Sequence, residues 1–234
     1  MPIYLRYSTD IATLFLTLGI ISFLFIIYRR GGSFQFRLSP LSVSVDTPDA
    51  NQSTIHYPVL VRAMRDFATI VHLQDYQNLG KVYTEVLVGA SRCGRGSENR
   101  VALMIVDDSG QHLVCKEGVR HSMDAKRNWR FNLDEMTPAI VAFKESRIYN
   151  CPDVNKDKLW KPLPNANRPT YQSFCCVPIK VEQKVWGILN IDSPRRNAFN
   201  SQAEEDLKMY ATVLGFVLEL EYKVGEGVLH EQDQ

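Results

Sequence analysis

The stretch Ser173–Asp192, SFCCVPIKVEQKVWGILNID, decides the fold of this chain. Two apolar runs, Phe174–Val181 and Val185–Ile191, flank a polar break of three residues. Both runs are rich in β-branched and aromatic residues, and so short a break is typical of a hairpin. Each run is apolar on both faces, which indicates strands that are covered on both sides. Pro178 lacks an N–H, so we expect it at an edge or a bulge, and Gly187 indicates a close approach to the backbone.

A long helix is predicted after this hairpin. Beyond a polar turn, Ser201 and Glu204 have the spacing of a capping box, in which both side chains satisfy free N–H groups of the first helical turn. The apolar residues that follow recur at three- and four-residue intervals, which predicts an amphipathic helix. They are Leu207, Tyr210, Ala211, Leu214, Val217 and Leu218.

Further helices and a second hairpin are predicted upstream. Apolar stripes with helical spacing occupy residues 60–71 and 79–90. Residues 101–106 and 112–115 are typical of paired strands, joined by a turn that begins at Asp107. In such a turn we expect carboxylates to accept bonds from nearby backbone N–H groups, and we expect no metal. Thr137-Pro138 predicts the start of a short helix. This order of elements indicates an α+β fold, with an antiparallel sheet flanked by helices.

The N-terminal region contains a candidate membrane span. Residues Ile11–Tyr28, IATLFLTLGIISFLFIIY, carry no charge and follow a short tail, 1–10. Eighteen residues of helix span about 27 Å, close to the hydrocarbon thickness of a bilayer. We predict one transmembrane helix; a cleaved signal peptide fits less well, because the basic residues follow the apolar run. Those arginines, Arg29, Arg30 and Arg37, predict a cytoplasmic C-terminal domain and a single-pass membrane protein.

The rest of the chain divides into a linker, one domain and a tail. Residues 29–56 have no clear period and are rich in turn residues, so we expect an extended linker. The predicted α+β domain occupies residues 57–224, and residues 225–234 form a polar tail. The net charge is +1 and the basic residues are scattered, so we expect no nucleic-acid partner. The five cysteines contain no C-x-x-C pair, so we expect reduced thiols rather than a disulfide framework or a zinc site.

The C-terminal half resembles GAF domains, which are sensory modules that bind small molecules. The resemblance rests on Ser173-x-x-x-Val177-Pro178-Ile179, on Gly187-Ile188-Leu189, and on Asp192-Ser193, Phe199 and the closing helix, and it extends over about residues 57–222. It implies that a ligand lies between the sheet and the segments that cross it. Aromatic, hydroxyl and basic side chains there would suit a planar anionic ligand such as a nucleotide. We expect six residues to line the pocket: Arg130, Lys144, Trp160, Tyr171, Ser173 and Cys175.

The motifs of particular GAF classes are incomplete in this chain. Cyclic-nucleotide-binding GAF domains of phosphodiesterases resemble one another in an Asn-Lys, a later Phe and an Asp-Glu. Phe199 and Glu204 are in register with that pattern, but Asp192-Ser193 and Ala203 replace the other members. The salt bridge of that motif is therefore missing. Cys151 is followed by proline, unlike the cysteine of bilin carriers, and we expect no cofactor.

The sequence predicts a membrane-anchored cytosolic sensor without catalysis of its own. It contains no G-x-S-x-G, P-loop or H-E-x-x-H pattern. We expect it to bind a small ligand and to signal through homo-oligomerisation, its anchor or a partner. Two alternatives stay open. One is a redox enzyme that resembles free methionine sulfoxide reductases and uses Cys115, Cys151 and Cys175. The other is a GAF fold that serves only as a dimerisation module through its first and last helices.

Overall fold

The structure is a computed structural model, and it describes residues 34–38, 41–45, 57–96, 98–121, 129–159 and 171–232. The chain forms two compact units, Met1–Pro58 and Val59–Gln234. The predicted span Ile11–Tyr28 and the tail 1–10 lie outside the described residues. Among the helices that are described, none combines the length and the apolar character needed to cross a membrane.

The first unit contains a hairpin that the sequence interpretation missed. Strands β1 (Phe34–Leu38) and β2 (Leu41–Val45) pair antiparallel, with Phe34 opposite Val45 and Leu38 opposite Leu41. Both strands alternate apolar and polar residues, and this period of two was the signal available in the sequence. The predicted linker 29–56 therefore contains regular structure.

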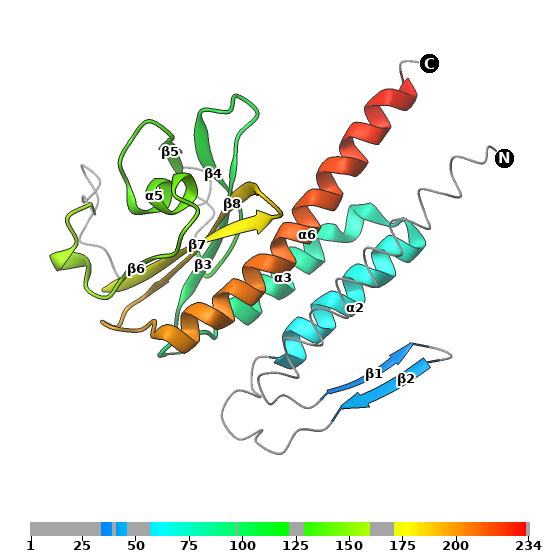
Figure 1. Ribbon diagram of the computed structural model, residues 1–234, viewed down its shortest axis with the longest axis horizontal. Helices are drawn as coiled ribbons and strands as arrows, with labels where there is room; N and C mark the ends of the chain where they lie inside the picture. Colours follow the sequence, from blue (N-terminus) through cyan, green and yellow to red (C-terminus); the bar gives the residue numbers. More distant parts are fainter. Residues whose placement is uncertain are drawn as a thin grey trace. The chain divides into compact units, whose positions relative to one another are not determined.

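The second unit is built on an antiparallel sheet of six strands. Their order across the sheet is β5-β4-β3-β8-β7-β6 (Figure 1). The α+β class and the antiparallel sheet predicted from the sequence are confirmed. The strands are β3 (Arg100–Val106), β4 (His112–Val119), β5 (Arg130–Asn132), β6 (Tyr149–Cys151), β7 (Ser173–Val181) and β8 (Lys184–Ser193).

The β7–β8 hairpin has the features expected from Ser173–Asp192. β6 pairs only with residues 174–176, so Pro178 lies beyond its end, on an open edge and beside a bulge at Ile179/Lys180. A Cβ atom added at Gly187 would lie 2.1 Å from the carbonyl oxygen of Met104 on β3. Both predictions are confirmed. Pro178 lies at an edge and beside a bulge, and β3 and β8 pair too closely at Gly187 for any side chain.

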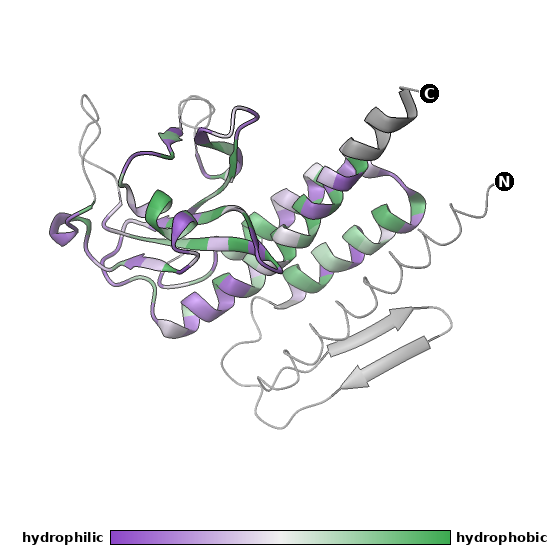
Figure 2. Cartoon of the chain, turned by 45° about the horizontal axis from the view of Figure 1, so that its top comes forward, coloured by the Kyte–Doolittle hydropathy of each residue, from purple (hydrophilic) through white to green (hydrophobic). Residues whose placement is uncertain are grey.

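Helices cover both faces of the sheet. α3 (Leu79–Ala90) and α6 (Ser201–Gln232) pack together on one face, and the short α5 (Pro138–Lys144) lies on the other (Figure 1). We call the second face the α5 face. Figure 2 shows apolar residues along the central strands and α5, whereas the first turns of α6 are hydrophilic. The remaining helical elements are α2 (Tyr57–Leu73) and two 3₁₀ turns, η1 (Tyr76–Asn78) and η2 (Val154–Lys156).

The starts of α5 and α6 test the two cap predictions. Thr137 caps α5, since its hydroxyl accepts a hydrogen bond from the Ile140 N–H at 3.4 Å, as predicted. The capping box at Ser201 is wrong. The amide oxygen of Asn200 accepts from the Ala203 N–H at 2.9 Å, so Asn200 is the N-cap residue.

Glu204 is engaged elsewhere. Its carboxylate accepts a hydrogen bond of 2.6 Å from the side-chain amide of Asn150 on β6. The contact ties the start of α6 to the edge strand of the sheet, and this long-range partner is not visible in the local sequence pattern.

Candidate functional site

An apolar cluster fills the space between the sheet and α5. Its members come from the α5 face of β3, β4, β6, β7 and β8, from α5 and from η2. Partly buried side chains, among them Trp129, Phe143, Tyr149 and Tyr171, pack against this cluster. Its buried residues are Ala102, Met104, Leu113, Ala139, Ile140, Ala142, Cys151, Val154, Phe174, Cys176 and Ile188.

A charged pair lies on the same face at the end of the central strands. Arg100 on β3 is directly opposite Asp192 on β8, and the Arg100 Nε donates to the Asp192 Oδ1 at 2.7 Å. Asp192 is only 3% exposed. Burial raises the pKa of Asp192 to about 6, although the hydrogen bond and the charge of Arg100 act in the opposite direction. The carboxylate therefore holds the guanidinium at a fixed position and bears a desolvation cost.

Aromatic rings adjoin this pair. The Arg100 guanidinium carbon lies 5.5 Å from the centroid of the Tyr171 ring. Tyr171 meets Phe174 edge to face at 6.2 Å, and Phe174 stacks on Tyr149 at 6.1 Å. The site thus combines an oriented cation with a series of three rings, a combination that suits a planar ligand.

Part of the guanidinium is available to a ligand. The Arg100 side chain is 28% exposed, and among the described residues only Asp192 accepts from it, through Nε. Its terminal nitrogens carry four more N–H donors. They can bind a carboxylate, a phosphate or a carbonyl group, because the planar fork of arginine matches these acceptors.

Two further polar contacts occur at the β6 side of this face. The Tyr149 hydroxyl donates to the Asp157 Oδ2 at 2.8 Å, and burial together with Asp157 raises the pKa of Tyr149. The Cys176 thiol donates to the Asn190 Oδ1 at 3.1 Å. Asn190 is half-buried, so its amide is a second group near Phe174 and Cys176 that can bond to a ligand.

The structure places the six predicted ligand residues in different locations. Tyr171 is beside Arg100 on the α5 face, as described above. Lys144 is exposed in the last turn of α5. Trp160 lies outside the described residues. Ser173 and Cys175 are buried, and Cys175 is absent from the cluster to which its neighbour Cys176 belongs.

Ser173 and Cys175 point to the opposite face of the sheet. The Ser173 hydroxyl donates to the Arg195 carbonyl at 2.6 Å and accepts from the Ala198 N–H at 3.4 Å. Burial raises the pKa of Cys175, and the charge of Glu204 on α6 adds to the effect. The two side chains support the loop before α6, and a ligand role for the set of six stays a prediction.

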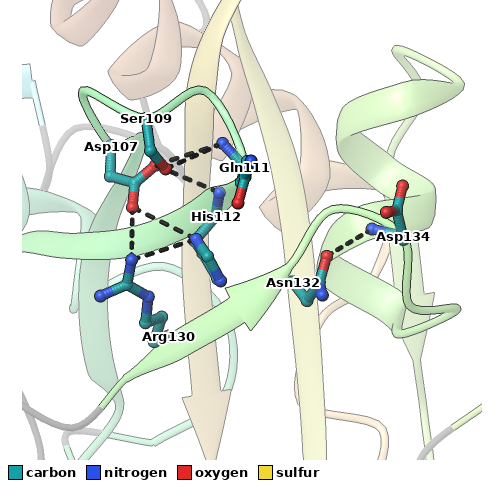
Figure 3. A network of polar contacts seen from close by, with 7 residues as sticks. All are labelled: Asp107, Ser109, Gln111, His112, Arg130, Asn132 and Asp134. Carbon is teal, nitrogen blue, oxygen red and sulfur yellow. Dashed lines mark hydrogen bonds and ion pairs between the residues drawn. The ribbon is translucent and has the colours of Figure 1, made fainter.

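Arg130 belongs to a separate polar network at the β3–β4 turn (Figure 3). Its guanidinium bonds to the Asp107 Oδ2 at 2.8 Å and contacts the His112 Nδ1 at 3.1 Å. The Asp107 Oδ1 accepts from the Ser109 hydroxyl at 2.6 Å and from the backbone N–H groups of Gln111 and His112, both at 3.2 Å.

These contacts confirm the predicted turn. The Ser109 hydrogen bond is the largest cause that lowers the pKa of Asp107, to about 2. No group of potential metal ligands occurs among the described residues. The Arg130 side chain is 57% exposed. Its ion pair with Asp107 connects β5 to the turn in this structure.

A groove of about 490 Å³ lies between the open edge of β7 and α6. Three of its lining cations already have partners: Arg147 pairs with Glu145, Lys208 pairs with Glu205, and the Lys180 Nζ donates to the Ser146 carbonyl at 3.3 Å. Pro178 and Lys180 on the edge are typical of strands protected against pairing with another chain. We assign no ligand to this groove.

The cysteines of the redox alternative are not gathered in one place. Cys151 faces the α5 side, whereas Cys175 faces α6. Burial raises the pKa of Cys151 to about 12, and it also raises the pKa of Cys176. Cys115 is half-buried and its thiol donates to the Glu117 carbonyl at 3.5 Å. None of the five cysteines forms a disulfide with another described residue, and thiolate formation is disfavoured at the buried positions.

Sequence reasoning missed Arg100 and Asn190 and used Asp192 only as a motif position. A signal was present, because Arg100, Asn190 and Asp192 are polar residues within or at the ends of apolar runs. Such residues in a two-sided strand need a partner. The partner of Arg100 is 92 residues away, so only the strand register identifies it.

Solved structures support the fold. The GAF domain of a phosphoenolpyruvate-protein phosphotransferase from Coxiella burnetii superposes with a TM-score of 0.59 at 17% identity, covering 73% of this chain and 96% of the other. The corresponding domain from Acinetobacter gives a TM-score of 0.56 at 17% identity, covering 74% and 98%. A type II free methionine-R-sulfoxide reductase from Thermoplasma acidophilum gives only 0.43 at 23% identity, covering 51% and 77%. The first two similarities show the fold alone.

A comparison with curated proteins finds no match. A comparison with protein families matches residues 81–218, more than half of the chain, to the GAF domain. This range extends from α3 to α6 and includes the whole six-stranded sheet. The chain therefore belongs to the GAF domain family.

Proposed function

We propose that this protein is a sensor that binds a small ligand on the α5 face of its GAF domain. One observation carries the proposal: a half-buried guanidinium, Arg100, is oriented by the buried Asp192, adjoins Tyr171 and has terminal N–H groups without a described partner. Burying a charge costs free energy. Hydrogen-bond donors that the protein leaves unpaired beside such a charge are expected where a ligand binds to them.

The proposed ligand is planar and carries an anionic or carbonyl group. Its ring would contact Tyr171, Phe174 and Tyr149, and its acceptor group would bind Arg100. A nucleotide or a cyclic nucleotide has both features. Asn190, whose amide is half-buried, offers a further hydrogen bond to the edge of the ring.

The proposed setting is the cytoplasmic face of a membrane. Residues Ile11–Tyr28 would anchor the chain as a single-pass protein, and the GAF domain would signal through homo-oligomerisation, the anchor or a partner protein. The support comes from the uncharged run of eighteen residues and from the arginines that follow it.

The redox-enzyme alternative receives no support from the thiols. Methionine sulfoxide chemistry of this type needs a reactive thiolate, and burial raises the pKa of the candidate cysteines Cys151 and Cys175. We therefore favour the sensor.

The test is native mass spectrometry of the full chain, purified from cells in detergent, for wild type and for Arg100→Gln. The wild-type protein is expected to carry a small molecule, or to bind a member of a nucleotide panel, and Arg100→Gln is expected to weaken binding at least tenfold because a charge-assisted contact is lost. Arg62→Gln on the exposed surface of α2 is the matched control. Equal binding by Arg100→Gln and wild type, or an apo mass that the nucleotide panel leaves unchanged, would remove this proposal.

A further inference from the structure

Two loops meet at one end of the GAF domain, after α3 and before α6. Residues 91–99 and 193–200 are joined by a hydrogen bond of 2.8 Å from the Arg95 N–H to the Ala198 carbonyl. The Ser193 hydroxyl also donates to the Arg95 carbonyl at 3.5 Å. A Cβ atom at Gly96 would lie 3.2 Å from the Nε of Arg195, so the side chain of one loop lies against the backbone of the other.

Asn99 holds the loop after α3 in place through hydrogen bonds. This residue is fully buried, and its amide donates to the carbonyl groups of Cys93 at 2.8 Å and Gly96 at 3.3 Å. The loop after α3 is thus fixed at two points along its length. Arg92 and Arg95 are therefore carried by a backbone that these hydrogen bonds hold in place.

The two loops concentrate positive charge. Residues 91–99 and 193–200 contain four arginines and one glutamate, whereas the whole chain has a net charge of only +1. Arg196 is within 3.5 Å of Asp153. Arg92, Arg95 and Arg195 are exposed, and no carboxylate among the described residues lies within ion-pair distance of them. We call these three residues the arginine surface.

Four other cations of the domain have carboxylate partners. Arg100, Lys116, Arg130 and Lys223 each have a carboxylate within 2.9 Å. The arginine surface therefore gathers three exposed cations to which the described residues supply no carboxylate. Guanidinium groups bind phosphate well because their planar donors match its oxygens and because they are weakly hydrated.

We propose that the arginine surface docks against the anionic phospholipid headgroups of a membrane. Three exposed guanidinium groups on two joined loops fit an extended array of phosphates, and clustered basic residues are attracted to an anionic leaflet within a Debye length. The docking rests on the proposed membrane anchor and does not rest on the ligand site at Arg100. In an anchored chain a weak contact suffices, since tethering gives the domain a high effective concentration at the bilayer.

The test uses the full chain in lipid nanodiscs made of phosphatidylcholine alone or with about one-third phosphatidylserine. Hydrogen exchange of residues 91–99 and 193–200 is expected to slow about tenfold in the anionic discs at low salt, and the protection is expected to disappear as salt rises and screens the charges. The variant Arg92→Gln/Arg95→Gln/Arg195→Gln is expected to show no difference between the two lipid compositions. It keeps the Arg196–Asp153 contact, and the exposed side chains that it changes make no ion pair with the described residues.

A matched variant removes three other exposed cations: Arg62→Gln/Arg65→Gln/Lys81→Gln. This variant makes the same change in net charge at another place on the domain. It is therefore expected to show the wild-type protection of residues 91–99 and 193–200 in the anionic discs. A triple arginine-to-lysine variant at the arginine surface is expected to keep most of the protection, since headgroup attraction depends on charge. Equal exchange in the two disc types, equal loss in the matched variant, or protection by a single-stranded oligonucleotide but not by anionic lipid would overturn the proposal.

Discussion

The carboxylate of Asp192 is the buried charge on which the candidate site depends. It fixes Arg100 through a bond of 2.7 Å, and the pair lies across neighbouring strands rather than within one loop. Because burial outweighs the favourable effect of Arg100, the pKa of Asp192 is raised to about 6 from an ordinary value of 3.8. The folded protein therefore holds this proton more tightly than the unfolded chain does.

This pKa shift predicts how stability depends on pH. Between about pH 4 and pH 6 the folded state binds more protons at Asp192 than the unfolded state, so the free energy of unfolding falls as pH rises through this window. The expected contribution is on the order of 3 kcal/mol. It is measured as the difference between urea unfolding curves of wild type and Asp192→Asn at a series of pH values. Asp107, whose pKa is lowered to about 2, contributes only at more acidic pH and cancels in the difference. Parallel pH profiles of the two proteins would contradict the shift.

Gly187 is a second residue with a measurable role. Alanine at this position would place its Cβ 2.1 Å from the Met104 carbonyl oxygen, and both groups belong to paired backbones that cannot move apart cheaply. We expect Gly187→Ala to lower the free energy of unfolding by more than about 3 kcal/mol. Gly80→Ala is the control, since a Cβ there has no neighbour within 4 Å, and we expect a gain of about 0.5 kcal/mol. Thermal or urea unfolding measures both, and a tolerated Gly187→Ala would mean that β3 and β8 are further apart.

Single residues were predictable from the sequence where the constraint is local. Gly187 and Pro178 were recognised because backbone geometry alone limits where they occur in a strand. Arg100 was not recognised, because its function depends on a partner that the strand register supplies. The sequence predicts Ser173 and Cys175 on the ligand side, yet they face α6, because alternate residues of a strand point to opposite faces and Phe174 and Cys176 occupy the α5 face.

At the scale of elements, the start of α6 distinguishes two capping arrangements. Asn200 accepts from the Ala203 N–H, whereas Ser201 is an exposed helical residue. We expect Asn200→Ala to cost about 1 kcal/mol of unfolding free energy and Ser201→Ala to cost less than about 0.3 kcal/mol. Urea unfolding of the two variants side by side measures this difference. The reverse order would restore the capping box predicted from Ser201 and Glu204.

Elements with strong periodicity were predicted well. The β7–β8 hairpin, the stripes of α2 and α3, and α5 with its Thr137 cap all follow from local patterns. The β1–β2 hairpin was missed because its strands are short and lie in a stretch rich in turn residues. The cap of α6 was misassigned because Glu204, the expected capping partner, bonds to Asn150 on a strand 54 residues away.

At the scale of the whole molecule, the proposed sensor needs a route from its ligand site to an output. The pair of Arg100 and Asp192 lies on β3 and β8, and β8 continues through the arginine-bearing loop 193–200 into α6. Loop 193–200 is therefore a short covalent connection between the ligand site and α6, the longest helix that the structure describes. Coupling along this path needs two arrangements of α6 or its loop, and ligand-dependent hydrogen exchange of 193–200 is the measurement that detects them.

The proposed anchor predicts where the chain is found and which way it faces. In cells that express the full chain, we expect it to stay in the membrane fraction after an alkaline wash. Two arginines in the middle of the predicted span, Leu18→Arg/Ile21→Arg, would raise the cost of insertion by about 6 kcal/mol and release the protein. The matched change Leu18→Ala/Ile21→Ala removes the same side chains without adding charge and is expected to leave the protein membrane-bound.

Protease added to inverted vesicles, but not to intact spheroplasts, is expected to digest the GAF domain, because the arginines after the span favour a cytoplasmic C-terminal side. If the arginine variant fractionates like wild type, membrane association arises elsewhere in the chain, and the arginine surface becomes the first candidate to examine.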